Sequence, residues 1–381
     1  MDDEKAIMLR EIAMQPAFVR ENIDGMLADM RAVLHRRSVG SLRHGFLIGC
    51  GDSYAAALAA RGYMARATGL WVEAVEALEF SRYLVEHIPA DSFVFGVSNS
   101  GTVSRTIEGV RLARERGAWT CAVTVSADNA LARTAETLLK VNAPPNIKER
   151  AGGGRIVTPG SITYTASMLG LFVAGIAFGE HAGTLDAATS AELVQELRAT
   201  ADHMATADAA MAGRCRALAP DMRPDRKLII LGGGPGYATA YFGLAKWFEA
   251  LQQPAHLSQL EEWAHEHYFI TGPDTDTMIV LPPGASRDRG LEQAQAAREM
   301  GSRVYIIGSS DDAAARAAAD VYFPMPAGMR EPLTPFVYKL PFEYLACHVA
   351  QHRGIAFLGF DDARRQQVNF RQIFDSAQAP G

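Results

Sequence analysis

The chain carries one pattern twice, and this internal repeat limits what it can fold into. "IGCGDSYAAALAARGY" in the first half matches "LGGGPGYATAYFGLAKW" in the second, so that Tyr54 and Tyr237 lie 183 residues apart (237 − 54). The same offset relates Phe95 to Met278, Val123 to Ile306, and Arg133 to Arg316. A register that holds across several apolar runs and helical stretches predicts two copies of one structural unit.

Each copy alternates short apolar runs with stretches of helical period. We expect strands at "HGFLIGC", "WVEAVEA", "SFVFGVS", "WTCAVTV" and "LLKVNA", and in the second copy at "KLIILGG", "AHLSQ", "TMIVLPP", "RVYIIGS" and "VYFPMP". Continuous apolar strands separated by helices are typical of parallel sheets covered on both faces. The predicted fold class is α/β, with two tandem doubly wound parallel sheets in flavodoxin-like three-layer sandwiches. The predicted boundaries are a helical lead-in at 1–33, domains at 34–200 and 201–354, and a tail at 355–381.

Composition narrows the class of protein. A formal net charge of -6 with no Lys/Arg-rich run gives no general attraction for nucleic acid. The acidic start "MDDEKAIMLREIAMQ" does not resemble a secretion signal, and no apolar run reaches the roughly 20 residues that span a bilayer. We therefore expect a cytoplasmic protein with no membrane partner. Its four cysteines, Cys50, Cys121, Cys215 and Cys347, are far apart, which predicts reduced thiols.

The stretch "SNSGT" lies between an apolar run and a helical stretch. Hydroxyls, a glycine and the free N–H groups of a helix start form a cradle for an anion, usually phosphate. An ordinary helix N-cap would use the same residue types. "GCGDSY" lacks the third glycine of a dinucleotide fingerprint, so NAD binding is disfavoured. A metal at "HEH", His265 to His267, is also disfavoured, because residues two apart on a helix point in different directions.

At these residues the chain resembles the tandem-domain members of the sugar isomerase (SIS) family, the isomerase half of glucosamine-6-phosphate synthase and the fructosamine-6-phosphate deglycases. The resemblance rests on "MLREIAMQP", "CGDS", "SNSGT" and "CHVAQHRG" and covers nearly the whole chain. The glutaminase half of the synthase is not represented in it. The resemblance implies two SIS domains, a phosphosugar substrate and a homodimer with its active site at the interface. It implies no metal and no organic cofactor.

The resemblance also implies which residues bind the sugar phosphate. Ser53, Ser98, Asn99 and Ser100 match contact positions, and Val103 stands where the family has a phosphate-contacting threonine. Thr102, Ser104 or Arg105 would have to compensate, or the anion differs. The full predicted binding set is Cys50, Gly51, Asp52, Ser53, Ser98, Asn99, Ser100, Thr102, Val103 and Thr158, the last within a segment expected to close over the sugar. The second copy has "VLPPGAS" where the first has "SNSG", so we expect it to have exchanged binding for chemistry.

The predicted catalytic residues are Lys246, Glu249 and His265. Lys246 and Glu249 are three apart in "LAKWFEALQ" and share a helix face, and His265 follows Glu249 by sixteen residues. By the resemblance, Glu249 is a base beside the sugar carbonyl, His265 is an acid/base that in the synthase comes from the neighbouring subunit, and Lys246 orients the substrate. Apolar neighbours would raise the pKa of a partly buried Glu249. Residues alone allow a plainer interpretation, a solvated Lys–Glu pair and an ordinary histidine.

The tail favours one reaction. No lysine follows Lys339, whereas synthase-like isomerases form an imine through a tail lysine. We therefore expect cleavage of a C–N bond in a 6-phosphorylated fructosamine or amino sugar, by deglycase or deaminase chemistry. The alternatives are an aldose/ketose phosphosugar isomerase and a non-catalytic sugar-phosphate sensor; the latter usually carries a DNA-binding segment, which the lead-in does not resemble.

Overall fold

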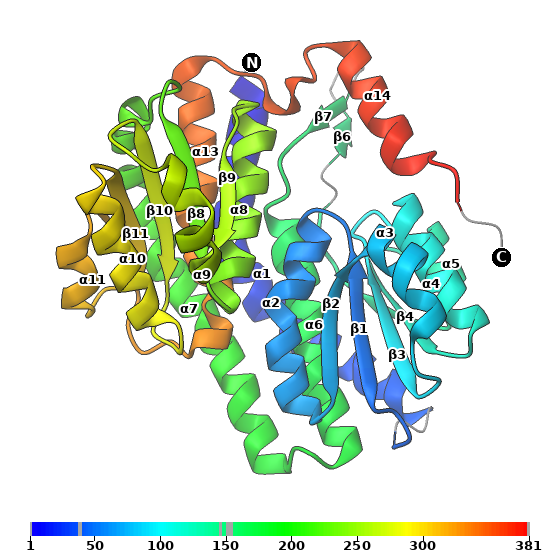
Figure 1. The fold of residues 1–381 in the computed structure, drawn as a ribbon. Helices are drawn as coiled ribbons and strands as arrows, with labels where there is room; N and C mark the ends of the chain where they lie inside the picture. Colours follow the sequence, from blue (N-terminus) through cyan, green and yellow to red (C-terminus); the bar gives the residue numbers. More distant parts are fainter. Residues whose placement is uncertain (1, 37–39, 145–146, 150–154, 379–381) are drawn as a thin grey trace. The chain divides into compact units, whose positions relative to one another are not determined.

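A computed structural model of the chain describes residues 2–36, 40–144, 147–149 and 155–378 (Figure 1). The chain divides into two compact units, each holding one copy of the repeat. The first-copy unit comprises Ala17–Asn146, Ile162–Ala199 and Asp362–Gly381. The second-copy unit comprises Met1–Pro16, Ile147–Ser161 and Thr200–Asp361.

These units are discontinuous, whereas the predicted boundaries cut the chain into continuous pieces. The lead-in is helical, as helix α1 (Asp2–His35), but its first half belongs with the second-copy unit and its second half with the first. Helix α7 (Ala187–Leu218) is divided in the same way near residue 200. The tail contributes helix α14 (Ala363–Phe374) to the first-copy unit.

The first-copy unit is built on a parallel sheet of order β2-β1-β3-β4-β5. Its strands are β1 (His44–Gly49), β2 (Trp71–Glu76), β3 (Ser92–Val97), β4 (Trp119–Thr124) and β5 (Thr137–Lys140). Every residue of β3 and β4 is buried, which explains why both read as continuous apolar runs. The helices that join and cover these strands are α2 (Asp52–Thr68), the short α3 (Ala77–Glu79), α4 (Ser104–Glu115), α5 (Ala130–Thr134) and α6 (Ile162–Ala182).

The two faces of this sheet are packed by different helices. Val94 and Ala122 point to the face covered by α3, α4 and α5. On the other face, Phe93 and Trp119 meet Phe178 of α6, with ring centroids 5.1 and 6.2 Å from it. Helix α6 has the length and apolarity of a membrane span, but its apolar window is entirely buried, as expected for a core helix.

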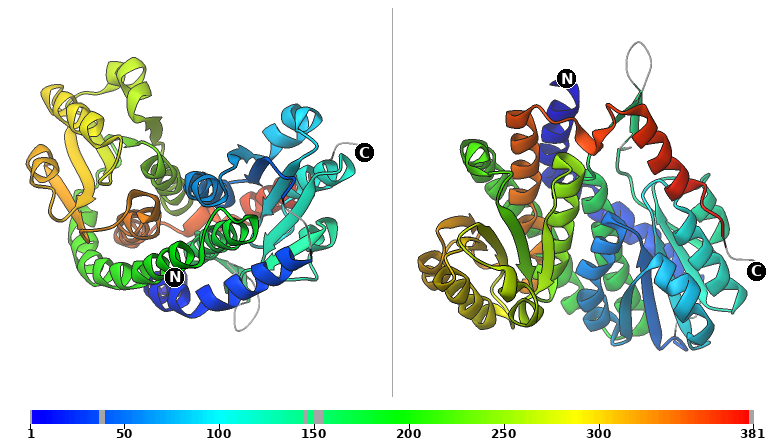
Figure 2. Two further views of the ribbon diagram at one scale, coloured as in Figure 1. Left: turned by 90° about the horizontal axis from the view of Figure 1, so that it is seen from below. Right: turned by 45° about the horizontal axis from the view of Figure 1, so that its top comes forward.

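The second-copy unit repeats this architecture. Its parallel sheet has the order β12-β11-β10-β8-β9, the same arrangement when corresponding strands are matched (Figure 2). The strands are β8 (Lys227–Gly232), β9 (His256–Gln259), β10 (Thr275–Leu281), β11 (Arg303–Ser309) and β12 (Val321–Met325). The helices are α8 (Pro235–Leu251), α9 (Leu260–His265), α10 (Arg287–Glu299), α11 (Ala313–Ala318), α12 (Pro335–Tyr338) and α13 (Leu340–Arg353). A hairpin of β6 (Ile147–Glu149) and β7 (Arg155–Val157), which the sequence analysis did not predict, also belongs here.

One face of the second sheet packs against α9, α10 and α11, with Trp263 of α9 among the buried residues over Ile229 and Ile306. The other face carries α8 and α13, which approach closely because Gly243 leaves room for the Phe342 ring. The predicted fold class is confirmed, and so is the repeat. Strands β1 and β8 start 183 residues apart (227 − 44), and so do helices α2 and α8 (235 − 52).

Candidate functional site

The predicted anion cradle is the loop between β3 and α4 in the first-copy unit. Ser98 is buried directly after the strand, and its Oγ accepts a hydrogen bond from the backbone N–H of Gly101, 3.1 Å away. Ser100 and Thr102 are exposed, with their hydroxyl oxygens 2.9 Å apart. These hydroxyls therefore lie together at the carboxyl end of a parallel strand, where doubly wound sheets bind their ligands.

Gly101 holds the cradle loop in shape. Its φ of +66° lies in the left-handed region, which side chains with a Cβ rarely adopt. A Cβ at this position would lie 2.1 Å from Cγ of Asn129. Asn129 itself is fixed, because its side chain accepts a hydrogen bond from Ala132 N at the start of α5 and donates one to Thr124 Oγ1. The loop is thus a rigid turn rather than an open connection.

Two features leave hydrogen-bond donors unused at this loop. Helix α4 begins after Val103, which provides no side-chain cap, so the first N–H groups of the helix lack the usual capping oxygen. Asn99 Nδ2 is buried with no hydrogen-bond partner in the part of the chain that the structure describes. An anion at the loop would accept from both kinds of donor, which favours the cradle over a plain N-cap.

The residues expected to compensate for Val103 have different positions. Ser104 Oγ donates to the carbonyl oxygen of Phe374, 2.7 Å away, at the end of α14. Arg105 binds Glu108, Ser376 and the carbonyl of Ala377. These two side chains therefore attach the C-terminal segment to α4, and of the three candidates Thr102 alone faces solvent beside Ser100.

The second predicted binding stretch is the turn between β1 and α2. Gly51 has φ +55° and ψ −127°, and its counterpart in the other copy, Gly234, has nearly the same values, +51° and −125°. Cys50 Sγ donates to Glu76 Oε1 at 3.3 Å. Burial, together with the Glu76 carboxylate, raises the pKa of the Cys50 thiol to about 12. Cys50 is therefore a neutral thiol in this turn, while Asp52 and Ser53 start helix α2 as half-buried residues.

Lys246 and Glu249 form the predicted pair on helix α8. The Lys246 side chain is fully buried, the Glu249 side chain is 30% exposed, and Lys246 Nζ lies 2.5 Å from Glu249 Oε2. The ammonium also lies 4.8 Å from the centre of the Phe242 ring. This is not the solvated pair of the plainer interpretation. The surroundings also differ from the apolar ones expected for Glu249, since an adjacent buried ammonium stabilises the ionised carboxylate, the form that a base requires.

His265 does not lie with this pair inside the unit. It ends helix α9, which packs with α10 and α11, whereas α8 covers the opposite face of the sheet. The His265 side chain is 68% exposed, and its Nε2 lies 3.5 Å from Glu261 Oε1, one helical turn away. An exposed histidine on the other face is available to a second copy of the chain rather than to its own Glu249.

Thr158 is buried in the second-copy unit. Its hydroxyl donates to Glu11 Oε2 of helix α1 at 3.1 Å, and both side chains are nearly inaccessible. Three residues on, Ser161 Oγ accepts from Gln15 Nε2 at 2.9 Å. Glu11 and Gln15 belong to the lead-in motif "MLREIAMQP", so this motif ties α1 to the "TPGS" segment. The role expected of Thr158, contact with the sugar, stays a prediction.

Sequence analysis missed a buried charged cluster around Gln15. Lys339 Nζ lies 3.0 Å from Glu343 Oε2, both side chains are fully buried, and both contact the Gln15 amide. Burial lowers the pKa of Lys339, the Glu343 carboxylate opposes that shift, and the charge of Lys246 lowers it further. The signal was present in "YKLPFEYL", where a lysine and a glutamate four apart interrupt an apolar stretch.

Lys339 and Lys246 face the same aromatic ring. Their Nζ atoms lie 5.8 and 4.8 Å from the centre of the Phe242 ring. Each ammonium has its own carboxylate, Glu343 for Lys339 and Glu249 for Lys246. Fixed neighbouring charges of this kind restrict where Lys246 can place Nζ, and through it the Glu249 carboxylate.

Comparisons with known proteins agree with this architecture. Residues 41–169 match the model of the SIS domain. The chain is 24% identical over 352 residues to the glutamine–fructose-6-phosphate aminotransferase (isomerizing) of Gloeobacter violaceus, a match that covers 91% of this chain and 56% of that protein. The chain thus spans little more than half the length of the curated relatives that it matches.

Solved structures share the fold. The C-terminal domain of glucosamine-fructose-6-phosphate aminotransferase from Francisella tularensis superposes with a TM-score of 0.80 at 19% identity, covering 92% of this chain and 97% of that one. Glucosamine-6-phosphate deaminase from Thermotoga maritima superposes with a TM-score of 0.66 at 14% identity, covering 92% and 95%. At these identities the comparison concerns the fold alone.

Proposed function

We propose, from the premise that residues 41–169 belong to the SIS domain family, that this chain is an enzyme acting on a phosphorylated sugar. We further propose that it cleaves the C–N bond of a 6-phosphorylated fructosamine or amino sugar. The observation that carries the proposal is the fully buried ammonium of Lys246 against a Glu249 carboxylate that still reaches solvent. Placing a charge in the core is costly, and holding a base ionised and oriented is a function that offsets the cost.

Each group has a role in this chemistry. The loop of Ser98, Asn99 and Ser100 would hold the phosphate with its hydroxyls and free N–H donors. Glu249 would remove a proton from the carbon between the amine and the carbonyl, giving an enolamine. Return of a proton to the former carbonyl carbon gives an imine, water adds to the imine carbon, and the C–N bond breaks. His265 would donate the proton with which the amine leaves.

The substrate's own amine makes a tail lysine unnecessary, because the imine forms on the substrate nitrogen. This fits the sequence after Lys339, which contains no lysine. We propose that the enzyme is a homodimer in which His265 comes from the neighbouring copy, since within one chain it lies on the face of the sheet opposite to α8.

The test is release of amine or ammonia from a panel of 6-phosphorylated fructosamines and glucosamine 6-phosphate. Glu249→Gln should lower kcat at least about a thousandfold while leaving substrate binding within a few-fold, because general bases contribute roughly 10²–10⁴-fold. Glu262→Gln is the matched control, an exposed glutamate on α9 with no proposed role. Turnover by Glu249→Gln at the wild-type rate would refute the proposed base.

His265→Asn completes the test. It should also be nearly inactive, and mixing it with Glu249→Gln should restore turnover if the two side chains act from different copies. An aldose/ketose isomerase is the second candidate, favoured by the isomerising relative that matches 91% of the chain. Interconversion of fructose 6-phosphate and glucose 6-phosphate without amine release from any panel member would select it.

A further inference from the structure

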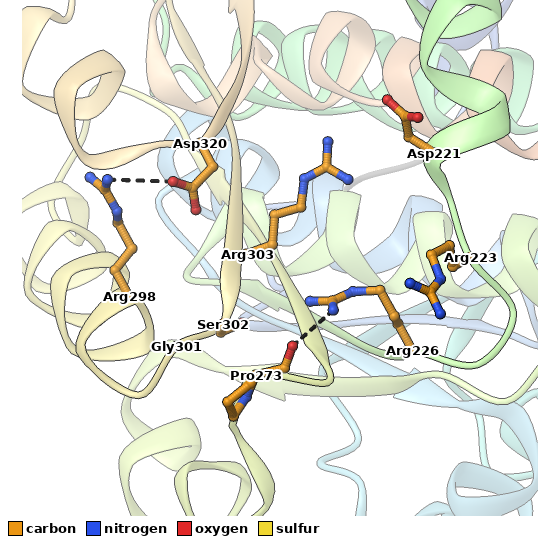
Figure 3. A pocket seen from close by; sticks show the side chains of 9 residues that line it. All are labelled: Asp221, Arg223, Arg226, Pro273, Arg298, Gly301, Ser302, Arg303 and Asp320. Carbon is orange, nitrogen blue, oxygen red and sulfur yellow. Dashed lines mark hydrogen bonds and ion pairs between the residues drawn. The ribbon is translucent and has the colours of Figure 1, made fainter.

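A second charged cavity lies in the second-copy unit, at the amino-terminal edge of its sheet. Its volume is about 590 Å³, within the range of small-molecule sites. The charged side chains that line it are Asp221, Arg223, Arg226, Arg298, Arg303 and Asp320. Figure 3 shows that they come from separate segments and surround one space. The proposed acid–base residues Lys246, Glu249 and His265 are not part of this lining.

The four arginines are engaged to different degrees. Arg226 is fully committed, because it binds Asp276 at 2.7 Å and the carbonyl oxygens of Pro273 and Thr275. Arg298 donates to Ala317 O, and its Nη2 lies 3.4 Å from Asp320. Arg223 has a well-exposed ion pair with Asp225 of the kind that contributes little to stability.

Arg303 differs from the other three. It begins β11, and within the described part of the chain its guanidinium has no hydrogen bond or ion pair. Its contact is with the ring of Tyr305, whose centre lies 5.0 Å from Arg303 Cζ. A stacked guanidinium keeps its in-plane N–H groups directed outward, where they can bind an oxyanion in bidentate fashion.

The repeat supplies an internal reference for these charges. Asp276 stands 183 residues after Phe93, and its register partner on the next strand is Arg303, whereas that of Phe93 is Trp119. Phe93 and Trp119 are fully buried and pack with their ring centroids 6.4 Å apart. The same fold therefore accepts an aromatic pair at the place where the second copy has a carboxylate and a guanidinium. The charges are not required by the architecture.

The floor of the cavity carries a further polar group. The Tyr305 side chain is fully buried, and its hydroxyl has no hydrogen-bond partner among the described residues. Burial raises the pKa of Tyr305, and the charges that act on it next are those of Asp276, Arg303, Arg226 and Asp221. The phenol is thus a neutral donor close to the same charged groups. Buried donors without an acceptor are uncommon unless a ligand or water supplies one.

We propose that this cavity is a second anion site, which binds a phosphate ester of sugar size. Arg303 and Arg223 would bind the phosphate oxygens, since guanidinium groups match phosphate geometry. Asp221 and Asp320 would accept hydrogen bonds from hydroxyls of the same ligand. The site does not depend on the reaction proposed above. A ligand here would act as an effector or a second substrate rather than at the cradle of the first-copy unit.

Hydrogen–deuterium exchange of the full chain, followed by mass spectrometry, locates binding without assuming one site. Glucose 6-phosphate at about 10 mM, enough for a site with a millimolar Kd, should protect peptides covering 221–226 and 298–304. Arg303→Met should raise the apparent Kd for this protection at least tenfold. Arg223→Met, a change at an exposed residue that cannot prevent folding, should raise it several-fold. Protection of 97–104, the cradle loop, should not change in either variant.

Arg289→Met is the matched control, because Arg289 belongs to the same unit and forms only exposed ion pairs. It should bind like the wild type. No protection of 221–226 and 298–304, or equal protection in Arg303→Met, would overturn the site. Inorganic phosphate should bind at least tenfold more weakly than glucose 6-phosphate; equal affinity would overturn the assignment of a sugar-sized ligand.

Discussion

In the first-copy unit, helices α2 and α6 meet through small and apolar residues, whereas in the second-copy unit the corresponding layer contains charges. Gly175 and Gly179 let α6 approach Met64 and Ala67 of α2, and Tyr63 stacks on Phe172 at 4.4 Å. The equivalent layer around α8 and α13 buries Lys246, Lys339 and Glu343. Since the same architecture forms with either lining, the buried charges are not needed for folding. They indicate where function is located.

The carboxyl ends of the middle strands differ in the opposite sense. After β3 the first copy has the Ser98–Thr102 hydroxyls around Gly101, while after β10 the second has "PPGAS". Gly284 stands 183 residues after Gly101, yet its φ is not positive. The cradle is thus a property of the first copy, and the buried lysines are a property of the second.

The largest effect that we expect comes from the buried charges of the second copy. Lys339→Met removes one partner of a fully buried ion pair and leaves Glu343 without its counter-ion. Loss of one partner of such a pair costs about 3–5 kcal/mol, which urea denaturation would measure. The double variant Lys339→Met/Glu343→Leu should recover most of this loss, because two apolar residues replace two charges. A single variant as stable as the wild type would contradict the buried pair.

The next effect concerns the cradle loop. Gly101→Ala places a Cβ at positive φ and against the fixed Asn129 amide, so we expect a loss on the order of 2 kcal/mol together with weaker phosphate binding. In Gly284→Ala the new Cβ would meet the far end of the Glu331 side chain, which can rotate away. Thermal unfolding and phosphate titration of both variants would measure the contrast. Equal losses in the two copies would show that the glycine has no special role in the first.

The smallest effect concerns the thiol in the β1–α2 turn. Because burial and Glu76 raise the pKa of Cys50 to about 12, its thiolate is scarce near neutral pH. Alkylation by iodoacetamide at pH 8 should be at least about tenfold slower than for a free cysteine, roughly 1.4 kcal/mol in activation free energy. The rate should keep rising as the pH passes 9, where that of a free thiol levels off. Mass spectrometry of the Cys50 peptide measures both, and rapid alkylation at pH 8 would contradict the hydrogen bond to Glu76.

Much of the fold could be predicted because its signals are local. The strands of both sheets appear as continuous apolar runs, and the glycine turns at Gly51 and Gly234 mark where strands end and helices begin. Lys246 and Glu249 could be paired for the same reason, since three residues on a helix bring two side chains together. The position of His265 on the opposite face of the sheet could not, because it depends on which helices cover which face.

The sequence by itself determined the repeat, the order of strands and helices, the cradle loop and the Lys246–Glu249 pair, all of which arise from spacings of a few residues or from one constant offset. Only the tertiary structure decided that Lys339 meets Gln15, 324 positions away, that Thr158 is bound by Glu11, and that Asp276 and Arg303 replace an aromatic pair beside a cavity. Such contacts depend on burial and on which chain segments pack together, and neither is encoded in local periodicity.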